Sequence, residues 1–355
     1  MGYGIPSVVS ELTATQLNLT DGREVSVAKN TTEFVEKIMR LYKDEELWNQ
    51  LQQNALDYVR QECNPETLKT SLKQIIDTAC MEINHAPVLM HKVIKGAVPH
   101  DPQVHTEIRR ELEKMGVDVV DFQICVNDFK DYLESAKYDT FHGYYNGGKA
   151  SNFIEKALEH YLAAKLLNLS EDDIYIDIAS ANSPVPEIYS RLFGCKVYRQ
   201  DLVYPAGIHG NAIGCDAGNM PVGDNFATKI ALHCSFEHFE QDADIRFIQE
   251  ASRVLKKGGK VCILPLYLFN KYSIQTDPRR WPRDGISFDD DAVLYCAEGW
   301  GERHGRFYDV PHLNSRVINN LKGLQLTIYY ILNEKEVAPS CYIKFMALLE
   351  KIAYE

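Results

Sequence analysis

The chain has 355 residues, 45% of them hydrophobic, which is enough for a large core and for more than one domain. Fifty acidic and 38 basic side chains give a formal net charge of −12, which argues against a nucleic-acid partner bound through its phosphates. Nine scattered cysteines indicate reduced, buried thiols and a cytoplasmic location, and no apolar run is long enough to span a bilayer.

Residues 1–82 form a first zone, which is too short to cover the apolar faces of its own predicted elements. Short β-branched runs at 6–9 and 24–27 predict strands, and apolar spacings of three and four residues predict helices over 34–42 and 47–59. Asn30, three residues before Glu33, is typical of a helix N-cap. We therefore expect a small α/β fragment here.

Residues 83–139 are interrupted by prolines and carry one charged helix near 107–115 and an apolar strand candidate at 117–126. This zone is predicted to be a connector with partial structure.

Residues 140–355 alternate between predicted strands and helices, the order that builds an open parallel sheet. The predicted elements are a helix at 152–167, a strand at 174–179, a helix at 186–192, a strand at 196–200, a short strand before 215, a strand at 229–234, a helix at 243–255 and a strand at 260–268. Runs at 324–332 and 342–349 fit a closing antiparallel hairpin. The prediction is an α/β, Rossmann-like open sheet of seven strands, five parallel plus the hairpin, with helices on both faces.

Four features of this last zone carry a resemblance. They are Asp177 within the first strand, Asp201 at the end of the second, the segment Asp-Ala-Gly-Asn-Met-Pro at 216–221, and the segment Arg-Val-Leu-Lys-Lys-Gly-Gly-Lys at 253–260. With them, residues 140–355 resemble the class I S-adenosylmethionine-dependent methyltransferases. Gly258 and Gly259 are also expected to end the preceding helix.

The resemblance implies S-adenosylmethionine as cofactor and assigns residues to it. Asp201 would accept hydrogen bonds from both ribose hydroxyls, Asp216 would accept the adenine amino group, and Met220 would pack on the ring; an ordinary Asx turn before Pro221 explains Asp216 nearly as well. The full implied set is Asp177, Ala179, Ser180, Asn182, Asp201, Leu202, Asp216, Ala217, Met220 and His233. No glycine lies between Asp177 and Pro184, where the family has a glycine-rich loop.

The fourth predicted strand ends near His233, and His238 follows it. A histidine beside the transferred methyl group can act as a general base, so both are candidate catalytic residues; strand packing for His233 and helix capping for His238 are the alternatives. His209, His233, Glu237 and His238 do not match a metal-ligand spacing, so no metal is expected.

The acceptor would be a small molecule, contacted by the loops at 201–210 and 277–308. The segments Gly4 to Ser10 and Arg40 to Trp48 resemble the end of a retaining, group 1 GT-B glycosyltransferase. This favours a carbohydrate or bacterial surface-polymer precursor as acceptor. A non-catalytic binding or scaffold module, or the remnant of a fused glycosyltransferase, remains the alternative.

Overall fold

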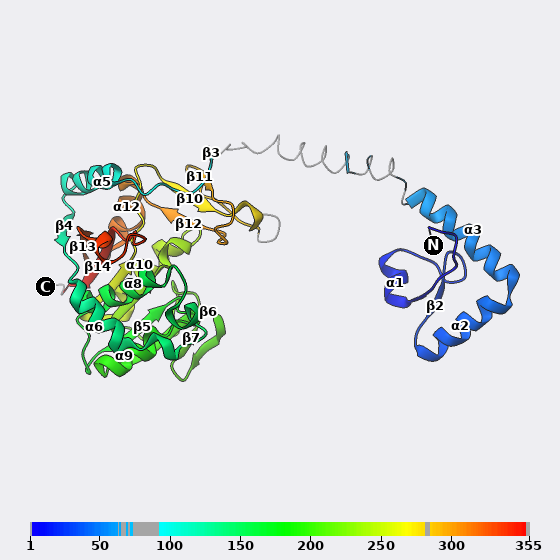
Figure 1. The fold of residues 1–355 in the computed structure, drawn as a ribbon, viewed down its shortest axis with the longest axis horizontal. Coiled ribbons are helices and arrows are strands. Elements are labelled where there is room, and N and C mark those ends of the chain that lie inside the picture. The colour runs from blue at the N-terminus through cyan, green and yellow to red at the C-terminus, as the bar shows by residue number, and fades with distance from the viewer. Residues whose placement is uncertain are drawn as a thin grey trace. The chain divides into compact units, whose positions relative to one another are not determined.

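A computed structural model of the protein describes residues 2–62, 64, 69, 72, 73, 92–280 and 285–352. The chain divides into two compact units, Met1–Leu89 and Met90–Glu355, called here the N-terminal and C-terminal units (Figure 1). No helix within the described ranges has the length and apolar character needed to cross a membrane.

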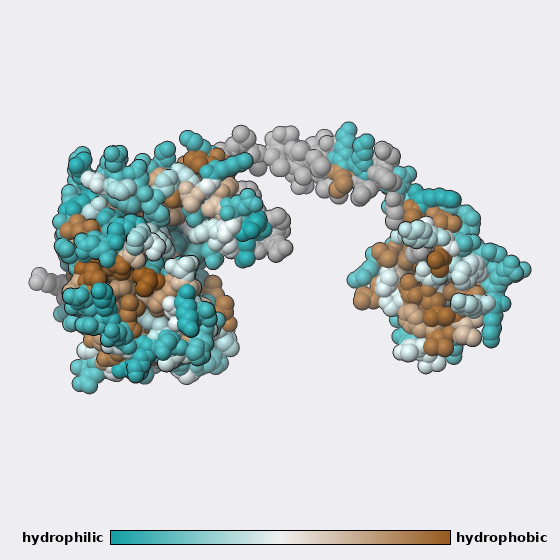
Figure 2. Space-filling view, viewed as in Figure 1, coloured by the Kyte–Doolittle hydropathy of each residue, from teal (hydrophilic) through white to brown (hydrophobic). Residues whose placement is uncertain are grey.

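The N-terminal unit is a small α/β unit, as expected. Its elements are β1 (Val8–Ser10), α1 (Glu11–Gln16), β2 (Ser26–Ala28), α2 (Thr31–Lys43) and α3 (Glu45–Glu62), with β1 and β2 paired in parallel. Asn30 caps α2 by accepting a hydrogen bond from the Glu33 amide at 3.0 Å, so the predicted cap is confirmed. Figure 2 shows apolar surface on this unit, and its resemblance to glycosyltransferases stays a prediction.

The C-terminal unit is built on an eight-stranded sheet. In spatial order its strands are β4 (Asp118–Phe122), β13 (Leu324–Ile331), β14 (Phe345–Lys351), β9 (Leu255–Leu264), β8 (Ala227–His233), β5 (Ile174–Ile178), β6 (Lys196–His209) and β7 (Ala212–Gly214). Within this sheet only β14 runs antiparallel to its neighbours β13 and β9. The Rossmann-like fold is confirmed, with one strand more than the predicted seven because β4 pairs in parallel with β13.

Helices cover both faces of this sheet. They are α5 (Pro102–Lys114), α6 (Val126–Ala136), α8 (Phe153–Leu167), α9 (Val185–Phe193), α10 (Ala243–Val254) and α12 (Val310–Arg316), with the single turns α7 (Tyr145–Gly148) and α13 (Glu334–Val337). One buried cluster joins α6, α8 and α9 to the sheet, and a second joins α5, α10 and α12 to its other face. The expected glycine cap is wrong: α10 ends at Val254 and leads straight into β9, where Gly258 has a φ of +72°.

A second sheet of four strands was not predicted. Its order is β12 (Gly305–Phe307), β10 (Ser273–Thr276), β11 (Val293–Cys296) and β3 (Val93–Lys95). The region 277–308, expected as one long loop, thus supplies two of its strands. The described part of the expected connector, from residue 92 on, likewise forms β3, α5, β4 and α6 of the C-terminal unit.

The cysteines agree only partly with the expected buried thiols. Cys63 and Cys80 lie outside the described residues, and the other seven are free thiols. Cys195, Cys262 and Cys341 are buried, whereas Cys125 is exposed.

Candidate functional site

Two neighbouring cavities lie at the ends of β5 and β8 and beside residues 200–202 of β6, at the edge where open α/β sheets bind ligands. The second predicted strand was expected to end at Asp201, but β6 continues to His209. The large cavity has a volume of about 630 Å³ and the small cavity about 340 Å³. Ala179 and His238 line both. An elongated ligand can therefore extend from one into the other.

The loop that follows β5 lines the large cavity and, through Ala179, the small cavity as well. It has no glycine, yet it adopts the backbone conformation that glycine usually supplies. Ala179 and Ala181 have φ values of +52° and +41°, which are costly for residues with a Cβ. Hydrogen bonds from β6 hold this loop: the Ala179 amide donates to Gln200 Oε1 at 3.2 Å and the Ala181 amide donates to Asp201 Oδ2 at 2.8 Å. Small side chains and a fixed turn together let the backbone approach a ligand.

The small cavity contains most of the residues expected around the nucleoside. It is lined by Asp201, Leu202, Asp216 and Ala217. Asp216 accepts a hydrogen bond from the Gly218 amide at 2.8 Å, as in an Asx turn, and its carboxylate also pairs with Arg246, so part of its bonding capacity is used.

Met220 is not placed as expected. It is buried at 3% exposure in the core cluster and is not among the described residues that line either cavity. The Met220 side chain is therefore not placed to cover an adenine ring in either cavity.

The large cavity contains Asp177, Ser180 and Asn182. Asp177 is fully buried, and burial raises its pKa to about 7. The Tyr175 hydroxyl donates to Asp177 Oδ1 at 3.0 Å, whereas Asp177 Oδ2 has no hydrogen-bond partner among the described residues. An unpartnered carboxylate oxygen beside a cavity is suited to a ligand that donates a hydrogen bond.

His233 lines the large cavity but is poorly suited to take a proton. Burial, with a smaller contribution from Lys156, lowers its pKa to about 3. Its Nε2 lies 3.2 Å from the Tyr175 hydroxyl, which donates its own hydrogen to Asp177, so Nε2 is the donor in this pair.

His238 has the opposite arrangement. Its Nδ1 is hydrogen-bonded to the backbone carbonyl of His304 and must be the donor, which leaves a lone pair on Nε2 in the neutral ring. Glu237 Oε1 lies 3.6 Å from that Nε2. A proton arriving at Nε2 would therefore be stabilised by a neighbouring carboxylate.

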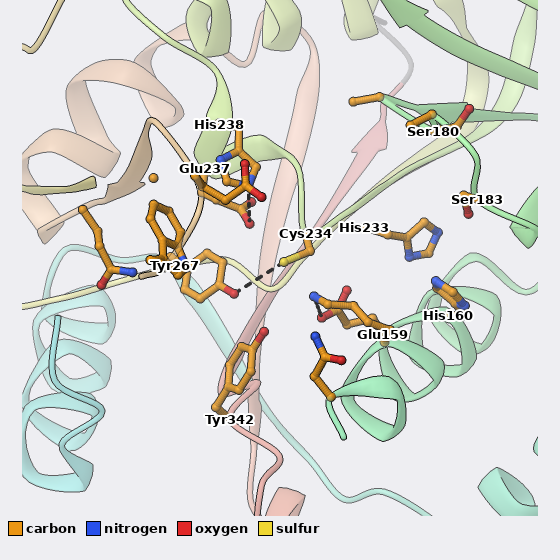
Figure 3. Close-up of a pocket in the computed structure, with 18 of the residues that line it drawn as sticks. Glu159, His160, Ser180, Ser183, His233, Cys234, Glu237, His238, Tyr267 and Tyr342 are labelled. Atoms are coloured by element: carbon orange, nitrogen blue, oxygen red, sulfur yellow. Dashed lines mark hydrogen bonds and ion pairs between the residues drawn. The ribbon is translucent and has the colours of Figure 1, made fainter. Parts of the chain in front are cut away.

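Helix α8 contributes an ion pair that the sequence did not reveal. Lys156 Nζ lies 2.7 Å from Glu159 Oε1, and both side chains line the large cavity, in which Figure 3 labels Glu159. Burial raises the pKa of Glu159 to about 8, and its Oε2 has no hydrogen-bond partner among the described residues. In the sequence this pair, three residues apart on a helix, was indistinguishable from a solvated one.

Aromatic side chains complete the large cavity. Tyr267 and Tyr342 lie opposite Glu159 in Figure 3. Phe307 lines the cavity from β12 of the second sheet, and Trp300 lines it from the loop before β12. His209 does not line it, and in the described ranges no three His, Cys, Asp or Glu side chains are grouped to hold a metal ion.

A family model described as a methyltransferase domain matches residues 191–263. No curated protein is significantly similar to the chain.

Solved structures with a similar fold include two methyltransferases. The 1,6-didemethyltoxoflavin-N1-methyltransferase of Burkholderia thailandensis, crystallised with S-adenosylhomocysteine, has 13% identity and a TM-score of 0.38, over 63% of this chain and 90% of its own. An S-adenosylmethionine-dependent methyltransferase from Clostridium acetobutylicum has 13% identity and a TM-score of 0.38, over 61% and 99%.

Proposed function

We propose that the chain is an S-adenosylmethionine-dependent methyltransferase that acts on a small polar acceptor. One observation carries the proposal: the segment that matches a methyltransferase domain, residues 191–263, supplies Asp201, Leu202, Asp216, Ala217 and His238, which line the small cavity. The same segment ends at β9, beside the strands whose carboxyl ends form the site.

The residues present fit such a cofactor. The small cavity would take the nucleoside, with the Asp201 carboxylate toward the ribose hydroxyls. The large cavity would take the methionine end, because Asp177 Oδ2 is buried without a hydrogen-bond partner in the described part of the chain and an ammonium group would donate to it.

Bound in these cavities, the cofactor would supply a methyl group on a positively charged sulfur to a nucleophilic atom of the acceptor. The contribution of this chain is alignment, exclusion of water and removal of one proton. We assign the proton to His238 Nε2, where the Glu237 carboxylate offsets the new charge.

His233 is then a positioning residue rather than the base. Its low pKa keeps the ring neutral, and its Nε2 hydrogen bond to the Tyr175 hydroxyl orients the group that holds Asp177. A carbohydrate or surface-polymer precursor is the finer proposal for the acceptor, and it depends only on the N-terminal resemblance.

Calorimetric titration with S-adenosylhomocysteine tests the proposal. We expect saturable binding of one equivalent by the full chain, and a loss of binding when excess S-adenosylmethionine is already present. Absence of any heat at millimolar ligand, in a protein shown to be folded by circular dichroism, would instead favour a scaffold module that no longer binds the cofactor.

A further inference from the structure

The large cavity is acidic. Among the described residues that line it there are four carboxyl groups, one lysine and no arginine; the carboxyl groups belong to Glu159, Asp177, Glu237 and Glu302. Phosphate and carboxylate ligands are usually bound by arginine or by several cations. The one lysine, Lys156, is already paired with Glu159 at 2.7 Å, so an anionic acceptor finds no unpaired lysine or arginine among these residues.

Two buried carboxyl groups of this cavity, those of Asp177 and Glu237, have no lysine or arginine at ion-pair distance among the described residues. Glu159 is paired with Lys156 at 2.7 Å, and Asp177 lies on the cofactor side beside Tyr175. Glu237 is 5% exposed, and its Oε2 has no hydrogen-bond partner among the described residues. Its ion-pair contact in the described part of the chain is His238 Nε2 at 3.6 Å, a nitrogen without a hydrogen in the neutral ring.

A carboxylate in this position is costly unless a donor reaches it. A buried charged oxygen without a partner is destabilising, and a ligand that donates a hydrogen bond to it removes that penalty. A positively charged donor recovers more than a hydroxyl does, because charge-assisted hydrogen bonds are the stronger kind.

Aromatic rings surround the same space. The ring centroids of Tyr267 and Phe307 are 5.0 Å apart, those of Tyr267 and Tyr342 are 6.4 Å apart, and the His238 and Trp300 rings are 6.0 Å apart. Figure 3 shows Glu237, His238 and Tyr267 grouped on one side of the cavity, away from Ser180 and Ser183. A carboxylate beside aromatic faces is a suitable site for an organic cation.

We infer that the acceptor carries a protonatable amine, which the Glu237 carboxylate binds among the aromatic rings of the large cavity. This inference rests on the proposed function and narrows it from a small polar acceptor to a cationic one. Neutral polyols are weaker ligands of this site, and anionic acceptors are rejected.

Three sugars of similar size test it, namely glucosamine, glucose and glucuronate. Their dissociation constants are measured by ligand-observed NMR at pH 7 with the full chain saturated by S-adenosylhomocysteine. We expect glucosamine to bind about tenfold more tightly than glucose, which corresponds to about 1.4 kcal/mol, and glucuronate to bind most weakly. Equal binding of all three, or preference for glucuronate, would overturn the inference without any variant being made.

Two matched variants locate the effect. Glu237→Gln keeps the shape of the side chain and removes its charge, so the preference for glucosamine should fall to about twofold or less. Glu302→Gln makes the same change at an exposed residue lining the same cavity and should keep the preference. If Glu237→Gln keeps it, Glu237 is not the amine-binding residue.

The same titrations separate this inference from the proposed function. If S-adenosylhomocysteine does not bind, the proposed function fails and the amine inference fails with it. If S-adenosylhomocysteine binds and the amine preference is absent, only the inference is overturned.

Discussion

Asp201 has two tasks in this site. Its Oδ2 accepts a hydrogen bond from the Ala181 amide at 2.8 Å and its Oδ1 accepts one from the Val203 amide at 3.1 Å, so the carboxylate holds both the loop after β5 and the adjacent backbone of β6. A carboxylate has about four lone-pair positions, which leaves two for a vicinal diol. Asp201 can therefore bind the ribose and, at the same time, fix the left-handed backbone at Ala181.

We predict that Asp201→Ala weakens the binding of S-adenosylhomocysteine by roughly ten- to a hundredfold. The change removes charge-assisted hydrogen bonds worth about 1.5–3 kcal/mol, and each 1.4 kcal/mol is about a factor of ten. Calorimetry measures the loss. Asp172→Ala, an exposed acid of the turn before β5, is the control and should bind as wild type does. Wild-type affinity in a folded Asp201→Ala protein would remove Asp201 from the site.

Asp177 should make stability depend on pH. In the folded protein burial keeps its proton bound up to about pH 7, whereas in the unfolded chain an ordinary aspartate loses it near pH 4. Between these values the folded state holds more protons, so the contribution of Asp177 to the free energy of unfolding falls as pH rises. Urea denaturation of wild type and Asp177→Asn from pH 4 to 7 measures the difference. A parallel pH dependence in the two proteins would contradict the buried, protonated carboxyl.

Some of the site residues could be predicted from sequence patterns, and others could not. Asp177 and Asp201 could be placed from the sequence because Asp177 lies in a segment that predicts a strand and Asp201 directly follows another. Lys156 and Glu159 could not, since a charged pair on a helix is normally solvated, and only the packing of α8 shows that Glu159 is fully buried.

At the scale of elements, the large sheet could be predicted from local sequence, whereas the second sheet could not. The strands of the large sheet are mostly five residues or longer, and most contain a cluster of apolar residues that a local pattern can reveal. The strands of the second sheet have three or four residues, and β3 pairs with β11, whose residues lie just over 200 positions further along the chain. Local sequence carries no sign of such a pairing.

The second sheet is attached to α10 through a buried arginine. Arg306 of β12 has a side chain with no exposed surface, and it pairs with Asp244 at 3.1 Å and with Asp289 at 2.9 Å. Its neighbour Phe307 lines the large cavity. The ion pairs therefore fix the strand that shapes the acceptor side of the site.

We predict that Arg306→Met lowers the free energy of unfolding by about 3 kcal/mol or more, because removing one partner leaves a buried charge uncompensated. Arg303→Met is the matched control: Arg303 pairs with Glu240 at 2.7 Å but is about a third exposed, and its loss should cost about 1 kcal/mol or less. Guanidinium denaturation of both variants measures the two costs. Equal small losses would show that the buried pairs do not hold the second sheet.

At the scale of the whole molecule, each unit has a core made from its own residues. The buried cluster of the N-terminal unit contains Ala14, Leu19 and Val25, whereas the two large clusters of the C-terminal unit begin at Val98 and at Ile124. On α2 of the N-terminal unit, Val35, Ile38, Met39 and Tyr42 are each more than 40% exposed. The small unit thus has little apolar burial to stabilise it.

We predict that residues 90–355 alone fold and melt cooperatively, whereas a chain that begins at residue 135 does not. The shorter chain lacks β3 and β4, which pair with β11 and β13, and it lacks Ile108 and Leu112 of α5, which are 2% and 0% exposed in the core. Losing buried side chains of this size costs about 2–5 kcal/mol each, comparable with the total stability of an ordinary domain. Differential scanning calorimetry of both chains decides the boundary. A cooperative transition in the chain from 135, at the temperature of the longer chain, would show that residues 90–134 are an appendage and not part of the core.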